Sequence, residues 1–420
     1  MFAAVLYTQE QAPTSEPKQR VRAVRELGKQ GSETIPKLQE YLSDPVVDVR
    51  VEAVKAIVEI GTQRSLDPLI QATRDADPEV QIRATDGLVN FYLPGYVQTG
   101  LTASLRRAGG VLKSRWTDTN DQVIEAFIQV RAEVVGALGK LARGGSSMES
   151  RANAARAVGV LRGRAAIPDL LEALRSKDDQ VIYESLVALQ KIRDREVAPR
   201  IAFLLRDLNE KVQVAAIETT GMLQNKDALP QLRDVLDRAR SAKVRRAALG
   251  AIAMIPEEAS RELFARNLAN KDEMMRAAAA EGFGRLRNPG DRPMVEKAFE
   301  EERKRNPRLS QAFALVLLGQ REVSVHSPLR YLVDSLNTKA YQSVAQTFLI
   351  ELCRDAEVRK ELHAAVPKGT RDEKVLLAQI LARSGDSATV PVLEALSQDP
   401  DADVAQEGVR ALRSLRARLP

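Results

Sequence analysis

A pattern of apolar and small residues recurs along the chain at an interval of about 31 residues. Each copy starts at a residue that is most often valine or another apolar residue, and the next residue is usually arginine or another polar residue. The copies start at Gln19, Val49, Val80, Ser150, Val181, Val212, Val244, Met275, Leu309, Tyr341, Lys374 and Val404. Most steps span 30 to 34 residues. A period of this size predicts one supersecondary unit repeated along the chain, and not a set of unrelated globular domains.

The fourth residue after the start of each copy is usually small. The small residues are Ala23, Ala53, Ala84, Ala154, Ser185, Ala216, Ala248, Ala279, Ala345, Ala378 and Gly408. Phe313 is the exception at this position. A small side chain once per repeat allows neighbouring helices to approach each other closely.

A second pattern, which contains proline, lies between these segments. Its copies are Ile35-Pro36, Asp67-Pro68, Ile167-Pro168, Ala198-Pro199, Leu229-Pro230, Arg292-Pro293 and Val390-Pro391. Proline is tolerated in the first turn of a helix, where its missing N–H would have no partner. Each copy therefore predicts the start of a helix, and leucines and isoleucines at three- and four-residue spacing give that helix one apolar stripe.

Short acidic turns separate the two helices of each predicted pair. They are Asp44-Pro45, Asp77-Pro78, Asp178-Asp179 and Asp399-Pro400, and each acidic side chain can cap the following helix. Aromatic residues make up only 4% of the chain, so unbranched helix formers dominate. We therefore predict an all-α fold without β-sheet, an α-solenoid of about 12 to 13 antiparallel helix pairs.

The run from Ser43 to Arg50, with Asp44 six residues before Arg50, resembles the HEAT-repeat family. It is most similar to the short-repeat variant found in phycobilin lyases (PBS lyase HEAT-like repeats), over residues 18–420. The resemblance implies a hydrogen-bonded structural ladder along the stack, with Asp44 and Arg50 as members. Gln81 and Gln213 stand where the ladder arginine is expected, and Arg245 and Arg276 lack an aspartate six residues earlier, so we expect an incomplete ladder.

The repeat interval is broken between Val80 and Ser150, which predicts an irregular insertion at about 94–121. The insertion carries a basic and aromatic group made up of Arg106, Arg107, Lys113, Arg115 and Trp116. One interpretation is that Trp116 packs over the flank of a misaligned repeat. The other is that the loop contacts a partner or an anionic ligand. After it, Asp121 is expected to start a long helix that runs to about Arg143.

Residues 1–17 are expected to be a disordered or signal-peptide-like segment, because a short apolar run precedes a polar, proline-containing stretch. We expect a cytoplasmic location by default, and an exported or periplasmic one if this segment is the end of a signal peptide. No apolar run reaches the ~18 to 20 residues that a membrane span needs. Cys353 is the single cysteine, so neither an intramolecular disulfide nor a thiolate metal cluster can form.

The sequence contains no recognisable catalytic motif. His326 and His363 are the only histidines, and neither forms part of the His-Glu motifs with which HEAT-like deoxyhypusine hydroxylases bind iron. Neither a nucleophile elbow nor a phosphate-binding loop occurs. We therefore expect no catalytic residues, no cofactor and no metal.

The net charge of +6 is small for 420 residues, and the two signs are interleaved along the chain, which disfavours nucleic acid as a partner. We predict a noncatalytic scaffold or adaptor that binds a protein on its concave helix surface. The alternative is a lyase-like HEAT enzyme or enzyme subunit of the bilin lyase type, and a DNA-binding, glycosylase-like protein is less favoured. The helix positions expected to be exposed and to contact the partner are Glu52, Lys55, Arg83, Asp86, Arg156, Glu184, Lys191, Glu218, Met254, Glu281 and Arg285.

In particular, the small residues between 242 and 284 suggest a shallow groove. Met254 and Glu281 would lie on its floor, where a partner helix could dock. Close helix packing with local curvature is the other interpretation of the same residues.

Overall fold

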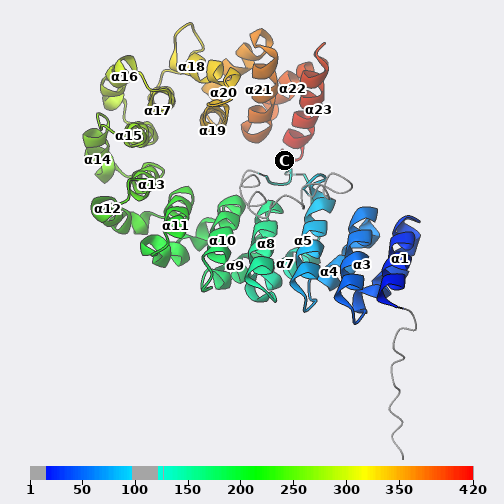
Figure 1. Cartoon of the computed structure of the whole chain (residues 1–420). Helices are drawn as coiled ribbons and strands as arrows, with labels where there is room; N and C mark the ends of the chain where they lie inside the picture. The colour runs from blue at the N-terminus through cyan, green and yellow to red at the C-terminus, as the bar shows by residue number, and fades with distance from the viewer. Residues whose placement is uncertain (1–15, 97–121, 126, 420) are drawn as a thin grey trace, which may run out of the picture. The chain divides into compact units, whose positions relative to one another are not determined.

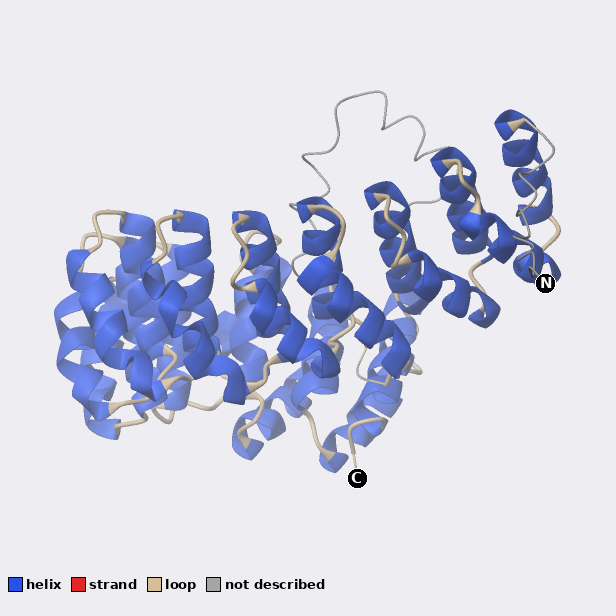
Figure 2. Ribbon diagram, turned by 90° about the horizontal axis from the view of Figure 1, so that it is seen from below, coloured by secondary structure: helices blue, strands red, loops and turns tan. Residues whose placement is uncertain are grey.

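The computed structural model describes residues 16–96, 122–125 and 127–419. All of the regular structure in these ranges is helical (Figure 2). The chain divides into two compact units, one formed by the residues up to Ile124 together with Val130–Ile192, the other by Glu125–Gln129 and the residues from Arg193 onward. The segment 1–15 and the insertion residues Arg106, Arg107, Lys113, Arg115 and Trp116 lie outside the described residues.

The first unit is a stack of short helix pairs. Its α-helices are α1 (Pro17–Gly28), α2 (Ile35–Glu40), α3 (Val47–Ile60), α4 (Leu66–Ala72), α5 (Pro78–Tyr92), α7 (Ala132–Gly144), α8 (Met148–Val160), α9 (Ile167–Ala173) and α10 (Asp179–Ile192). Its 3₁₀ helices are η1 (Ser32–Thr34), η2 (Tyr41–Ser43), η3 (Gln63–Ser65) and η5 (Arg164–Ala166). The longer helices α1, α3, α5, α8 and α10 pack on one another in that order.

The second unit continues the same plan. Its α-helices are α11 (Glu210–Met222), α12 (Leu229–Arg238), α13 (Ala242–Ala253), α14 (Arg261–Asn267), α15 (Glu273–Leu286), α16 (Arg292–Glu301), α17 (Arg305–Leu317), α18 (Pro328–Asp334), α19 (Gln342–Leu352), α20 (Ala356–Ala365), α21 (Arg371–Ser384), α22 (Val390–Leu396) and α23 (Ala402–Arg416). Its 3₁₀ helices are η6 (Arg195–Arg206), η7 (Lys226–Ala228), η8 (Glu258–Ser260), η9 (Pro289–Asp291), η10 (Ser335–Asn337), η11 (Val366–Lys368) and η12 (Ser387–Thr389).

Within the second unit, α13, α15, α17 and α19 lie on the inside of the curve, and α12, α14, α16 and α18 lie on its outside (Figure 1). We call the second helix of each pair the inner helix and the first the outer helix, in both units. We call the side of the inner helices that faces away from the outer ones the inner face. In the part of the chain that the structure describes, no helix is both long enough and apolar enough to cross a bilayer.

Proline starts the outer helices, as the sequence predicts. Pro36, Pro168, Pro230, Pro293 and Pro391 all lie in the first two positions of their helices. The first N–H groups of a helix have no acceptor within the helix. Proline, which lacks an N–H, therefore costs these helices no hydrogen bond at that position.

Two expectations about helix boundaries are wrong. Pro199 does not open an α-helix but lies inside the 3₁₀ helix η6, where its missing N–H interrupts helical hydrogen bonding. The long helix expected from Asp121 to Arg143 is shorter, because the described residues just before Ala132 are not helical and α7 starts there. Its N-terminus is fixed from outside the helix, where the Arg131 backbone N–H donates to the Tyr92 hydroxyl at 3.1 Å.

The acidic turns act as predicted in part. Asp77 accepts hydrogen bonds from the N–H groups of Glu79 and Val80, and therefore caps α5. Asp44 lies two residues before the N-cap position of α3 and instead accepts from the Val46 N–H at 2.9 Å, which stabilises the connection itself. Asp399 likewise accepts from the Asp401 N–H at 3.0 Å, and Asp401 is the cap of α23.

Apolar residues from successive pairs form a shared core. In the second unit one buried cluster runs from α17 to α23 and includes Phe313, Leu349 and Leu381, none of which is exposed to solvent. Phe313, the exception to the small-residue pattern, stacks on Phe348 with ring centroids 4.5 Å apart. The large side chain is accommodated there because its ring packs face to face against Phe348 of the neighbouring inner helix α19.

Elsewhere the inner helices approach closely through glycine and alanine. A Cβ added at Gly221 of α11 would lie 2.6 Å from the Cα of Ala251 in α13. At Gly284 of α15 it would lie 2.7 Å from the Cα of Ala314 in α17. By contrast, a Cβ added at Gly250 of α13 would meet no atom within 4 Å.

The two kinds of glycine predict opposite effects of alanine. Gly221→Ala should lower the free energy of unfolding by about 1–3 kcal/mol, because the added methyl overpacks the contact between α11 and α13. Gly250→Ala should raise it by about 0.5–1 kcal/mol, because alanine is the better helix former and the site is open. Urea unfolding followed by circular dichroism measures both. Equal effects of the two substitutions would contradict the close approach at Gly221.

Candidate partner-binding surfaces

Arginine–carboxylate pairs link each repeat to the next along the turns that precede the inner helices. Arg20 donates from Nε and Nη2 to Asp44 at 2.7 and 3.0 Å. Arg50 donates in the same bidentate way to Asp75 at 2.7 and 2.9 Å, and its Nη1 donates to the Asp44 backbone carbonyl at 2.9 Å. Two parallel charge-assisted bonds fix the relative orientation of the repeats.

The ladder therefore differs from the expected pairing of Asp44 with Arg50. The carboxylate of Asp44 pairs with Arg20 of the preceding repeat. Arg50 reaches Asp44 only at its backbone carbonyl and uses the rest of its guanidinium to bind Asp75. The geometry explains the difference, because Asp44 lies in the turn that faces the previous inner helix. Each rung, as we call one such cross-repeat pair, thus joins two repeats.

The ladder continues in the second unit at positions where an aspartate six residues earlier is missing. Arg276 donates to Glu302 of the next repeat at 2.7 and 3.0 Å. Lys374 donates to Asp399 at 2.8 Å. Arg276 has no aspartate six residues earlier, as the sequence shows, but it has an acidic partner 26 residues later in the chain.

The Glu302 rung is well shielded from solvent. The side chain of Glu302 is 6% exposed and that of Arg276 is 18% exposed. Burial alone would raise the pKa of the Glu302 carboxyl, but hydrogen bonds from Arg276 and from the backbone N–H of Lys304 hold that pKa below its ordinary value. The carboxylate is therefore ionised and paired at neutral pH.

Some rungs are built from other groups. Gln81 donates to the Asp75 carbonyl at 2.6 Å, and its side-chain oxygen accepts from the backbone N–H and the hydroxyl of Ser146. Arg308 donates to the Glu302 carbonyl at 3.2 Å, and its guanidinium lies 4.6 Å from the ring centre of Phe299 and 5.4 Å from that of Tyr331. There, aromatic faces take the place of the carboxylate.

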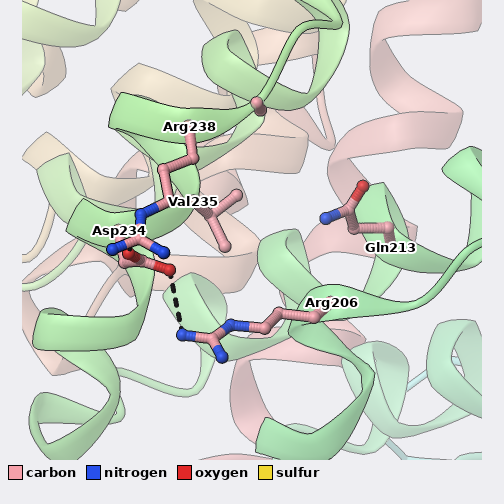
Figure 3. A pocket seen from close by; sticks show the side chains of 6 residues that line it. Arg206, Gln213, Asp234, Val235 and Arg238 are labelled. Carbon is pink, nitrogen blue, oxygen red and sulfur yellow. Dashed lines mark hydrogen bonds and ion pairs between the residues drawn. The ribbon is translucent and has the colours of Figure 1, made fainter.

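One rung has lost both charged members and leaves a pocket. Gln213 occupies the arginine position and Ala239 the carboxylate position. The pocket has a volume of about 310 Å³ and is lined by Arg206, Gln213, Asp234, Val235, Arg238 and Ala239 (Figure 3). Asp234 pairs with Arg206 at 2.9 Å and with Arg238 at 2.7 Å. The wall of the pocket therefore carries two cations and one anion.

The predicted residues of α3 and α5 lie in local ion pairs. Glu52 accepts from Arg25 of α1 at 2.7 Å and from Lys55 at 3.3 Å. Partial burial would raise the pKa of the Glu52 carboxyl, but these two donors hold it below its ordinary value. Arg83 pairs with Glu79 one turn earlier in α5.

Three residues expected to be exposed are buried. Arg156 of α8 and Glu184 of α10 form a bidentate pair at 3.2 and 2.9 Å, with their side chains 4% and 0% exposed. Asp86 is also buried and accepts from Asn153 at 3.1 Å. These side chains satisfy one another between adjacent inner helices, so they are not available to a partner as the sequence predicts. Lys191, near the end of α10, is half-buried.

A second network crosses the inner face of α15, α17 and α19. Arg285 of α15 donates to Glu351 of α19 at 3.0 and 2.9 Å and to Glu281 at 3.0 Å. Its guanidinium also lies 5.0 Å from the ring centre of Phe313 in α17. Burial opposes the charge, but Glu281 and Glu351 outweigh it and raise the pKa of Arg285. The network ties three inner helices together.

The inner face of α11 and α13 is more open. Glu218 and Met222 of α11 are exposed, Met222 to 42%. Met254, at the end of α13, is half-buried, and its carbonyl accepts from Gln224 at 3.2 Å, which joins the two helix ends. Partial desolvation of the Glu218 carboxyl by the residues around it raises its pKa, and the positive charge of Lys243 partly opposes this shift.

Of the predicted contact residues, the structure thus brings together Glu52 with Lys55, Arg156 with Glu184 and Glu281 with Arg285. It leaves Glu218 exposed. Sequence reasoning missed Met222 and Glu351, whereas Gly250 lies among the small residues between 242 and 284 that suggested a groove. Met222 lies four residues after Glu218 on the same helix, so helical spacing alone could have pointed to it.

The described residues contain no group of three or more histidines, cysteines, aspartates or glutamates that could hold a metal ion. Burial raises the pKa of the Cys353 thiol to about 12, so it is not a thiolate nucleophile at neutral pH. Burial lowers the pKa of His363, whose Nε2 lies 3.1 Å from the Thr389 hydroxyl.

A stack of paired helices linked by inter-repeat rungs defines an α-helical repeat protein. Comparison with known families identifies the kind of repeat. The HEAT repeats family matches residues 9–89, 197–284 and 229–317, and the PBS lyase HEAT-like repeat matches residues 150–176. The chain is a HEAT-repeat protein.

Among curated proteins, the chain is 29% identical over 148 residues to phycocyanobilin lyase subunit alpha of Nostoc sp. strain PCC 7120. The match takes in 32% of this chain and 54% of the lyase subunit, so the chain spans about half the length of that relative.

The similarity to solved structures is distant. Kap121p bound to Pho4p is 12% identical with a TM-score of 0.42, covering 96% of this chain and 56% of that one. Importin beta is 14% identical with a TM-score of 0.39, covering 97% and 60%. The complex of CpcE and CpcF of phycocyanin lyase from Nostoc sp. PCC7120 is 17% identical with a TM-score of 0.32, covering 83% and 99%.

The ladder gives a prediction on stability. Glu302→Gln should lower the free energy of unfolding at pH 7 by about 1–3 kcal/mol, because Arg276 then loses its charged acceptor. Glu301→Gln is the control, since Glu301 is exposed and its nearest cation is 4.0 Å away. It should change stability by less than about 0.5 kcal/mol. Chemical unfolding of the three proteins measures the difference.

The pH dependence has a defined sign. The folded-state pKa of Glu302 is depressed, so its stabilisation is present above the unfolded pKa of about 4.3 and is lost as the pH falls through the folded value. The gap in stability between the wild type and Glu302→Gln should therefore close on acidification. A gap that stays constant from neutral to acidic pH would contradict the charged rung.

Proposed function

We propose that the protein is a noncatalytic scaffold that binds an amphipathic helical segment of a protein partner on the inner face of α11, α13 and α15. The observation that supports it is the composition of this face. Met222 and Met254 lie at the adjoining ends of α11 and α13, small residues lie between them, and Glu218 and Glu281 flank them. Methionine adapts its shape to apolar partners, and shallow apolar strips accept amphipathic helices.

Gly250 marks the centre of this surface. It is half-buried in the middle of α13, and open space lies where its side chain would be. A partner helix can therefore approach the backbone of α13 closely. Glu218, Lys243 and Arg246 surround this region with charges of both signs, which suits a partner with mixed charge.

A steric block at Gly250 tests the proposal. Gly250→Arg should abolish recovery of the stoichiometric partner from lysate of the native cell, because the side chain projects into the binding surface without displacing any neighbour. The readout is quantitative mass spectrometry of proteins that co-purify with the full chain.

Gly136→Arg is the matched control. Gly136 lies in the outer helix α7, is also half-buried, and also has open space at its Cβ position. This variant should retain the partner, and circular dichroism should show both variants folded. A partner that binds Gly250→Arg as well as the wild type would refute the assigned surface.

The similarity to phycocyanobilin lyase subunit alpha supports a second candidate, a subunit of a lyase-type enzyme. This candidate expects a bound tetrapyrrole, which absorbs visible light. Incubation of the purified chain with phycocyanobilin, followed by gel filtration, separates the two proposals. Co-elution of visible absorbance with the protein favours the lyase-type role, and its absence together with a protein partner favours the scaffold.

A further inference from the structure

The second unit carries a basic rim on the turns that precede its inner helices. The turn from α12 to α13 and the helix ends that adjoin it hold Arg238, Arg240, Lys243, Arg245 and Arg246, all exposed, with no acidic residue from 238 to 256. The turn from α16 to α17 holds the exposed Arg303 and Lys304, and the start of α17 adds the exposed Arg305 and the half-buried Arg308. We call these two turns and the turn from α14 to α15 between them the basic rim.

The three turns lie side by side along one edge of the unit. Arg246 of α13 donates to Asp272, the cap of α15, at 2.8 Å. Arg276 of α15 in turn pairs with Glu302, in the turn before α17. Inner helices pack about 8–10 Å apart, so the N-termini of α13 and α17 are separated by about 20 Å. An extended peptide of about six residues spans that distance.

Four cations of the rim are not used by the fold. Through their side chains, Arg240, Lys243, Arg303 and Lys304 make no hydrogen bond or ion pair with any residue in the described ranges. Unlike α3, α5, α8, α10, α11 and α15, both α13 and α17 have no acidic residue in the first turn. Cations at a helix N-terminus interact unfavourably with the helix dipole. These four residues therefore destabilise the fold slightly, and no side-chain contact within the described part of the chain compensates for it.

Apolar contact points lie on the rim and in the turn next to it. Met274, at the start of α15, is 41% exposed, and Leu208, in the neighbouring turn before α11, is fully exposed. The pocket at Gln213 and Ala239 opens at the same edge, between Arg206 and Arg238. Asp272 and Glu273 interrupt the positive charge between the two basic turns. A continuous phosphate backbone would be repelled there, whereas a peptide can alternate carboxylates with apolar side chains.

From these observations we infer that the basic rim binds an acidic, leucine-containing segment of a partner protein. The segment runs along the turns before α13, α15 and α17, with its carboxylates at Arg240, Lys243, Arg303 and Lys304. One acidic side chain enters the pocket of the missing rung. The rim follows the turns before the inner helices and meets the inner face assigned above only at Lys243 and Arg246 of α13, so this inference goes beyond the proposed function.

The test measures binding of a fluorescein-labelled peptide of sequence Asp-Glu-Leu-Asp-Glu-Leu-Asp-Glu to the full chain by fluorescence anisotropy. The variant combines Arg240→Gln, Lys243→Gln, Arg303→Gln and Lys304→Gln. The control combines Lys18→Gln, Arg22→Gln, Lys29→Gln and Lys37→Gln, which removes the same charge from exposed positions of the first unit. The rim variant should bind about tenfold more weakly and the control within about twofold of the wild type.

Further arms decide the class of partner and exclude unfolding. Removing cations from helix N-termini should leave the thermal midpoint of the rim variant unchanged or raised. A single-stranded DNA oligonucleotide of matching formal charge should bind more weakly than the peptide. Equal peptide affinities of the rim variant and the wild type would overturn the inference, as would tighter binding of the oligonucleotide. Gly250→Arg should retain the peptide, so failure here and failure of the inner-face proposal are distinguishable.

Discussion

Neither helix of a repeat can bury its apolar stripe without the next repeat, and the rest of the structure follows from this constraint. The shared core from α17 to α23 exists because adjacent inner helices come close enough to exclude water. Glycine and alanine permit that approach at pairs such as Gly284 and Ala314. Where Phe313 replaces the small residue, an aromatic stack preserves the contact. The positions of the ladder and of the surface residues therefore depend on how adjacent repeats pack.

Once the stack is formed, charged residues fall into two groups. The ladder pairs, such as Arg50 with Asp75, use their charges to fix one repeat on the next. Arg240, Lys243, Arg303 and Lys304 of the basic rim make no such contact with the residues that the structure describes. A stack whose orientation is already fixed by rungs can tolerate unfavourable cations at the starts of α13 and α17, because each costs only about 0.3–1 kcal/mol. Binding function can accumulate there without loss of the fold.

The architecture was predictable from the sequence, whereas the charged contacts were not. Prolines at outer-helix starts and small residues at a fixed position are local signals, so the helix pairs and the all-α class follow directly from them. The ladder joins residues 24 to 27 positions apart, such as Arg20 with Asp44 and Arg359 with Asp386, and a search six residues upstream cannot find them. A search for a carboxylate one repeat later would have found Glu302 for Arg276.

The candidate surface residues were harder to predict for a related reason. A charged residue on an amphipathic helix looks exposed when that helix is considered alone, and Glu218 is indeed exposed. Arg156 and Glu184 look the same in sequence but meet across the contact between α8 and α10, where each removes the other from solvent. Exposure in a repeat protein is thus a property of two adjacent repeats.

The pocket shows what happens when this coupling is lost at one position. Substituting only one member of a rung would leave a shielded charge without its partner, which is costly. In the Gln213 and Ala239 rung both members are neutral, so that cost is avoided and open volume remains. The adjoining cations of Arg206 and Arg238 then face solvent, with Asp234 as their shared anion. A ladder built from interchangeable pairs can therefore convert one structural contact into a binding position while its neighbours hold the stack.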